Sequence, residues 1–201
     1  MISQLTTLNT DLAALVTTIR PGVVQLSNGP RGQGAGTIWR GDGLIVSNAH
    51  VVQRRAPRVT LADGRELPSH LIAVDEKRDL ALLRVDTADL PAIPPGDSRA
   101  LRPGEWVLAL GHPWGVVGAV SAGTVIAVGV PLEMPHYRGE LLQANLQLRP
   151  GHSGGPMVDG NGRLVGINTM LAGPYAGLAI PVHVVQAFVR QAVGATEPAY
   201  V

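Results

Sequence analysis

The chain has 201 residues, 45% of them hydrophobic, with 25 Gly and 16 Pro that separate many short apolar runs. This composition is typical of an all-β barrel protein rather than of a disordered chain. A net charge of +1 gives no broad attraction to nucleic acid or a membrane surface, and we expect neither as a partner. The absence of cysteine excludes disulfides and thiol chemistry.

The first half of the chain predicts one helix followed by short strands. Apolar residues recur at helical spacing from Ile2 to Ile19, and Pro21-Gly22 ends the pattern. Strands are predicted at 23–27, 36–40, 44–47, 58–61, 66–74 and 80–85. Asp63-Gly64 is a hairpin-type turn. The proline-rich segment 91–104 is interpreted as a linker.

The second half repeats this style. Strands are predicted at 106–110, 119–128, 141–146, 157–158, 164–168 and 177–180, with a closing helix at 182–193. The apolar stretch 116–130 is broken by three glycines and is too short to predict a transmembrane helix. We therefore divide the chain into an N-terminal helical segment (1–20), a first barrel (21–90), a linker (91–104), a second barrel (105–181) and a C-terminal helix and tail (182–201).

Three short segments carry residues suited to acyl transfer. Ser153 lies in the glycine-rich turn 151–156, and it is preceded in the chain by His50 and then by Asp79. A serine hydroxyl needs an adjacent base to become a nucleophile. His50 is the candidate base, and Asp79 is the candidate group that orients it. The backbone amides of Gly151 and Ser153, in the segment Gly151, His152, Ser153, are the candidate oxyanion hole.

These segments, in this order, resemble the trypsin-like protease domain of the HtrA/DegP family. The matching segments are Ser47–Val52, Asp79–Leu83, Gly111–Gly115, Gly151–Pro156, Val165–Thr169 and Gly177–Pro181. The resemblance implies an all-β fold of two antiparallel six-stranded barrels of the chymotrypsin type. It also implies a serine endopeptidase of protein quality control and stress response, which cleaves unfolded or misfolded protein. His50, Asp79 and Ser153 would then form the catalytic triad, and no cofactor or metal is expected.

The same resemblance carries further expectations about assembly and place of action. Members usually form trimers and act outside the cytoplasm, so we expect unfolded polypeptide substrates, a homo-oligomer and an extracytoplasmic location. The chain shows no signal-peptide pattern and leaves no room for a PDZ domain after its last helix. Ser153 follows His152, where the family usually has Asn, and His112 is a second replacement of this kind. The two imidazoles are either neighbours beside the oxyanion hole, able to couple their titrations or bind a metal, or independent and partly exposed turn residues, which is the favoured interpretation.

The primary substrate pocket is predicted by position in the fold. Its expected walls are Leu148, Ile167, Asn168, Thr169, Ala179 and Ile180. None is charged, so a charged side chain at the cleavage position would have no partner, and we predict a preference for small-to-medium aliphatic residues. Two other functions stay open: a latent or inactive chaperone or binding module on the protease fold, and a serine esterase. The His, Asp, Ser order argues against an α/β-hydrolase, in which Ser comes first.

Overall fold

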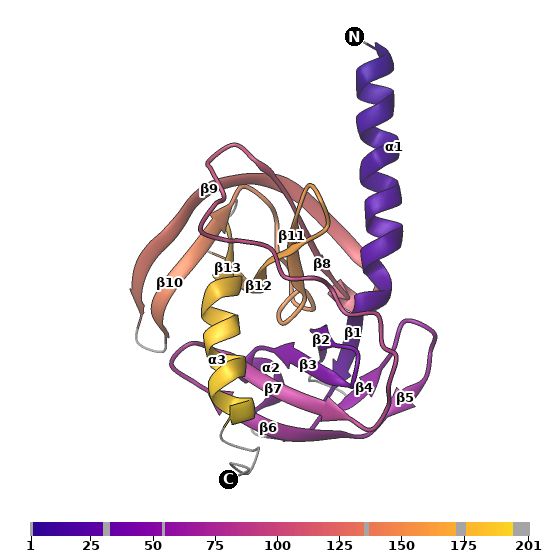
Figure 1. Cartoon of the computed structure of the whole chain (residues 1–201), viewed down its shortest axis with the longest axis vertical. Helices are drawn as coiled ribbons and strands as arrows, with labels where there is room; N and C mark the ends of the chain where they lie inside the picture. The colour runs from indigo at the N-terminus through magenta and orange to yellow at the C-terminus, as the bar shows by residue number, and fades with distance from the viewer. Residues whose placement is uncertain (1, 30–32, 54, 135–136, 172–175, 195–201) are drawn as a thin grey trace.

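The described part of the chain forms two β-structures and three α-helices (Figure 1). The computed structural model describes residues 2–29, 33–53, 55–134, 137–171 and 176–194. The helices are α1 (Ile2–Ile19), α2 (Ala49–Val52) and α3 (Val182–Gly194), with 3₁₀ turns at Arg20–Gly22 and Pro113–Gly115. None of the helices in these ranges is long and apolar enough to cross a membrane.

The first half forms one antiparallel seven-stranded sheet in the order β5-β4-β1-β2-β3-β7-β6. Its strands are β1 (Val23–Ser27), β2 (Gln33–Arg40), β3 (Leu44–Ser47), β4 (Arg58–Thr60), β5 (Glu66–Leu67), β6 (Ser69–Asp75) and β7 (Leu80–Val85). The β3–β7 pairing places Ser47 opposite Ala81, so the segments that follow β3 and precede β7 meet at one end of the sheet. His50 and Asp79 lie in these two segments.

The second half forms a closed six-stranded barrel in the order β10-β13-β12-β11-β8-β9. Its strands are β8 (Trp106–Gly111), β9 (Ala119–Met134), β10 (Tyr137–Ala144), β11 (Pro156–Asp159), β12 (Leu164–Leu171) and β13 (Gly177–Pro181). Ser153 lies in the turn that leads into β11, and Thr169 lies in β12.

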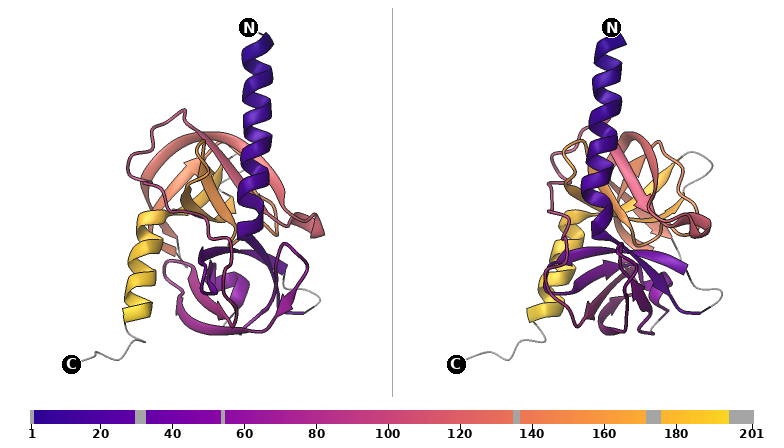
Figure 2. Two further views of the ribbon diagram at one scale, coloured as in Figure 1. Left: turned by 45° about the vertical axis from the view of Figure 1, so that its right-hand side comes forward. Right: turned by 90° about the vertical axis from the view of Figure 1, so that its right-hand side faces the viewer.

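Three apolar cores hold these parts together. One fills the first sheet and includes Leu26, Ile45 and Leu83, and another fills the second barrel and includes Leu142 and Met157. The third joins the two halves, because side chains of both sheets pack together in it with Phe188 of α3. Burial of this apolar surface therefore fixes the two halves against each other. The N-terminal part of α1 projects beyond both sheets (Figure 2).

The all-β fold class with terminal helices is confirmed, and the strand positions differ from the predicted ones mostly at their ends. The first half differs in two respects from the expected six-stranded barrel: it is an open sheet, and it has seven strands because the predicted strand 66–74 is divided at Pro68 into β5 and β6. The short helix α2 was not predicted, since four residues are too few to show a helical period. The predicted domain limits stay a prediction.

Candidate active site

His50 and Asp79 face each other across the end of the first sheet. His50 lies in α2, and its side chain is 51% exposed, whereas that of Asp79 is 11% exposed. The Asp79 carboxylate oxygens lie 2.8 and 3.0 Å from His50 Nδ1, and the His50 backbone amide donates to Oδ1 at 3.0 Å. A carboxylate on Nδ1 favours the tautomer that carries its proton there and leaves Nε2 free to accept one.

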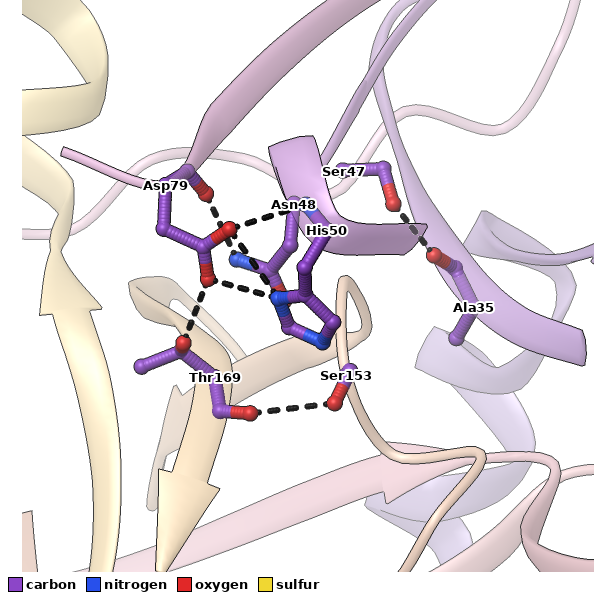
Figure 3. A network of polar contacts seen from close by, with 7 residues as sticks. All are labelled: Ala35, Ser47, Asn48, His50, Asp79, Ser153 and Thr169. Carbon is purple, nitrogen blue, oxygen red and sulfur yellow. Dashed lines mark hydrogen bonds and ion pairs between the residues drawn. The ribbon is translucent and has the colours of Figure 1, made fainter. Parts of the chain in front are cut away.

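Thr169 extends this contact into the second barrel. Its hydroxyl donates to Asp79 Oδ2 at 2.7 Å, and its backbone carbonyl accepts a hydrogen bond from Ser153 Oγ at 3.0 Å. A continuous hydrogen-bonded network thus runs from His50 through Asp79 and Thr169 to Ser153 (Figure 3). Figure 3 also shows the Nε2 edge of the His50 ring turned toward the Ser153 hydroxyl.

The turn that carries Ser153 is held against the first sheet. The Ala35 amide donates to the Ser153 carbonyl at 2.8 Å, and the Thr37 hydroxyl donates to the Gly154 carbonyl at 3.1 Å. Gly154 has a φ of +84°, and a Cβ there would collide with the Ala35 carbonyl and the Ser47 hydroxyl. Only glycine fits this position, because both the backbone conformation and the close approach exclude a side chain.

Two backbone amides of this turn have no partner in the described part of the chain. The Gly151 and Ser153 N–H groups donate no hydrogen bond there, whereas the His152 N–H donates to the Arg149 carbonyl at 2.9 Å. Gly151 adopts a φ of +105°, and a Cβ would collide with the His112 carbonyl. Of the three residues predicted to form an oxyanion hole, His152 therefore contributes no free amide.

His112 and His152 are both buried, contrary to the favoured interpretation of partly exposed histidines. They are 5% and 3% exposed, and their turns are directly linked, since the His112 amide donates to the Gly151 carbonyl at 2.8 Å. Their shielding follows from Gly111, which lacks a side chain where the His152 backbone packs against it. Neither Nε2 atom has a hydrogen-bond partner among the residues that the structure describes.

The two imidazoles contact the backbone through Nδ1. Gly118 N–H donates to His112 at 3.1 Å, whereas Nδ1 of His152 lies 3.2 Å from the amide nitrogen and 3.3 Å from the carbonyl oxygen of Arg149, and its tautomer decides whether it accepts from the one or donates to the other. Burial is the main cause that lowers the pKa of His112 to about 4, with lesser contributions from the charges of Arg20 and His152. The backbone of Val24 nearby acts in the opposite direction and raises the pKa. Burial also lowers the pKa of His152.

The residues predicted to line the substrate pocket are all buried, and they pack in different parts of the molecule. Ile167 and Ile180 belong to the core between the halves, whereas Leu148 and Ala179 belong to the core of the second barrel. The Asn168 amide donates to the carbonyls of Leu110 and Pro156. The hydroxyl of Thr169 binds Asp79, which lies 90 positions earlier in the chain, and no sequence signal indicated this contact. The pocket assignment stays a prediction.

No group of three or more His, Asp or Glu side chains among the described residues is placed to hold a metal ion. His112 and His152 are a pair without a third ligand of this kind.

Known proteins resemble the chain over most of its length. The model of the trypsin-like peptidase domain matches residues 34–167. The chain belongs to the trypsin-like peptidase family. A probable periplasmic serine endoprotease, DegP-like, from Halomonas elongata is 39% identical over 170 residues, which cover 82% of this chain and 36% of that protein. The putative serine protease HhoB of Synechocystis is 35% identical over 162 residues, which cover 78% of this chain and 39% of that protein. The chain thus spans little more than a third of these relatives.

Solved structures agree with this assignment. The HtrA-type protease AlgW with a decapeptide superposes with a TM-score of 0.83 at 28% identity, covering 90% of this chain and 67% of AlgW. AlgW with a tripeptide gives a TM-score of 0.82 at 33% identity, with 89% and 62% covered. The resemblance to HtrA/DegP proteases seen in the sequence is confirmed.

Proposed function

We propose that this member of the trypsin-like peptidase family is a serine endopeptidase that cleaves unfolded or misfolded protein. The observation that carries the proposal is the hydrogen-bonded network that joins His50, Asp79, Thr169 and Ser153 across the two halves of the molecule. Its DegP-like relatives have names that describe serine endoproteases, and the AlgW structures hold short peptides.

Ser153 is proposed as the nucleophile and His50 as the base. Ser153 Oγ attacks the scissile carbonyl carbon while His50 Nε2 takes its proton, and a tetrahedral intermediate forms. His50 then gives that proton to the leaving amine, which departs and leaves an acyl-enzyme. Water then attacks the ester while His50 Nε2 takes a proton from it, and His50 returns that proton to Ser153 Oγ as the acid product leaves. Asp79 holds the His50 tautomer and stabilises the imidazolium through the 2.8 Å contact with Nδ1.

The free amides of Gly151 and Ser153 are proposed to bind the oxyanion of the tetrahedral intermediate. Loss of one such donor typically costs about 2.7–4 kcal/mol of transition-state stabilisation. The positive φ of Gly151 sets the direction of its neighbouring peptide groups, so this glycine is proposed to be required for the geometry of the hole.

A latent resting state is favoured by the direction of the Ser153 hydroxyl. It donates to the Thr169 carbonyl rather than to His50, so the hydroxyl has to turn from Thr169 toward His50 before proton transfer. Catalytic hydrogen bonds commonly tighten only when substrate is bound. We therefore propose that substrate binding releases Ser153 from Thr169, and a chaperone-like state without cleavage is the alternative.

Substrate preference, assembly and location are proposed from the sequence and the relatives. We propose cleavage after small-to-medium aliphatic residues, because no charged group is present among the predicted pocket residues. The periplasmic DegP-like relatives support an extracytoplasmic site of action. A trimer is proposed from the family resemblance alone.

Covalent labelling tests the proposed function. The chain is treated with a fluorophosphonate probe, and the adduct is located by peptide mass mapping. Labelling at Ser153 that His50→Ala abolishes, together with cleavage of a reduced and alkylated protein that Ser153→Ala abolishes, supports a serine endopeptidase. Ester turnover without protein cleavage would instead indicate an esterase, and no labelling of the folded chain would indicate the binding module.

A further inference from the structure

Asp79 adopts an unusual backbone conformation for a residue with a side chain. Its φ is +54°, in the left-handed region that glycine tolerates and other residues rarely adopt. The turn between β6 and β7 places it directly before Leu80, the first residue of β7. A conformation of this kind persists only where the surroundings hold it.

The carboxylate and the backbone of Asp79 are held by different groups. The carboxylate accepts hydrogen bonds from the His50 amide, the His50 ring and the Thr169 hydroxyl. These bonds fix the end of the side chain, and within the turn the Arg78 N–H donates to Asp75 Oδ1 at 3.0 Å, one residue before Asp79. The backbone carbonyl of Asp79 instead accepts a hydrogen bond of 2.9 Å from Asn48 Nδ2 (Figure 3).

Asn48 is itself held in place, so its hydrogen bond can fix the position of the Asp79 backbone. It is fully buried and directly precedes α2, the helix that carries His50, and its backbone carbonyl accepts from the N–H of Val52, the last residue of that helix. Its Oδ1 has no hydrogen-bond partner. The opposite orientation of the amide would place two acceptor oxygens together, so the contact with Asp79 decides which way the group points.

We infer that Asn48 is a positioning residue, which holds the left-handed turn of Asp79 so that the Asp79 carboxylate faces His50 Nδ1. Two residues of the segment 48–50 then bind Asp79: Asn48 binds its backbone carbonyl, and His50 binds its carboxylate. The side chain of Asn48 binds the backbone of Asp79 rather than a reacting atom, so it would act on the orientation of the His50 ring through Asp79. This inference rests on the proposed function for its consequence in catalysis, but the geometric claim stands on the contacts alone.

Asn28 offers a matched control. It is half-buried, and its Nδ2 donates to the backbone carbonyls of Val51 and Val52 at 3.0 Å each, at the opposite end of α2. Asn28→Ala therefore deletes an amide that binds backbone carbonyls near the same helix, without touching Asp79. Both alanine variants leave carbonyl groups unpaired and are expected to lose stability.

The test compares Asn48→Ala with Asn28→Ala and the unchanged chain. We expect Asn48→Ala to lower kcat about 10- to 100-fold with KM within about twofold, while Asn28→Ala keeps both constants. In low-field proton NMR spectra, the Nδ1–H signal of His50 should shift or broaden in Asn48→Ala only. If folded Asn48→Ala keeps kcat and the NMR signal, or changes both no more than Asn28→Ala does, the inference is overturned.

Misfolding of the variant and inactivity of the unchanged chain also have a defined meaning for the inference. If Asn48→Ala does not fold, Asn48→Ser, which keeps a small donor, is measured in its place. A failure of both to fold would show that Asn48 serves the stability of the chain and would overturn the positioning role. If the unchanged chain neither reacts with a fluorophosphonate nor cleaves protein, the proposed function fails, whereas the NMR comparison still tests whether Asn48 positions Asp79.

Discussion

Acidification should destabilise this protein through His112. In the unfolded chain this imidazole takes up a proton near its ordinary pKa of about 6.5. In the folded protein, burial lowers its pKa to about 4. Below pH 6.5 the unfolded state therefore binds more protons than the folded state, and the free energy of unfolding falls as pH falls. Above about pH 7 both states are neutral at this position, so His112 contributes no pH dependence there.

The size of the effect follows from the two pKa values. At about 1.36 kcal/mol for each tenfold difference in proton affinity, the full loss is about 3.4 kcal/mol, of which about 3 kcal/mol is reached at pH 4. About 2 kcal/mol is lost by pH 5. Protonation would also remove the acceptor that Nδ1 offers to Gly118 N–H. The burial of His152 lowers its pKa and acts in the same direction.

Urea unfolding between pH 4.5 and 8 measures this loss in the unchanged chain and in two variants. His112→Asn keeps an oxygen acceptor for Gly118 N–H but cannot titrate, and it should remove most of the slope between pH 6.5 and 4.5. His70→Asn is the control, because the His70 side chain is 63% exposed and lies in β6, away from the buried turn. If His112→Asn lost as much stability on acidification as the unchanged chain does, the reasoning from burial would be refuted.

Three further outcomes are expected. Thr169→Val removes the 2.7 Å hydrogen bond to Asp79 and should slow labelling of Ser153 about tenfold, measured as a second-order rate; an unchanged rate would contradict the role given to this bond. Gly154→Ala should prevent folding or, where circular dichroism shows a folded protein, abolish labelling of Ser153, since Ala35 and Ser47 leave no space for a Cβ. A folded variant that is labelled at the rate of the unchanged chain would contradict this expectation. Trp114→Ala removes the ring that lies 4.7 Å from the Arg149 guanidinium and should cost about 0.5–1 kcal/mol in urea unfolding, because Trp114 is 70% exposed; a loss above about 3 kcal/mol would show that the ring has a larger structural role.

Much of the fold could be predicted, because the strands of this chain are marked by local signals. Apolar runs bounded by Gly, Pro and Asp-Gly turns predicted the bounds of β1, β3 and β7 to the residue. β9 continues to Met134, six residues beyond its predicted end, which was placed directly before Gly129. Pairing with β10 carries the strand past this glycine and through Pro131, and tertiary hydrogen bonds of this kind leave no local signal.

The residues of the candidate site could be predicted from the sequence, but the contacts between them could not. Residue type and order singled out His50, Asp79 and Ser153, since acyl transfer needs these groups. The bonds of Asn48 and Thr169 to Asp79 join residues 31 and 90 positions apart, and they depend on how the sheets pack. The burial of His112 and His152 was missed for the same reason: a histidine in a turn is ordinarily partly exposed, and only the docking of two turns against each other covers both.

The hydrogen bonds from Ala35 and Thr37 to the Ser153 turn have a consequence for biosynthesis. The first half of the chain emerges from the ribosome carrying His50 and Asp79, but the turn that bears Ser153 needs β2 of that half as a template. Under the proposed function, a nascent chain with only its first half folded would therefore have no assembled active site, and the site would form only when the second half docks onto the first.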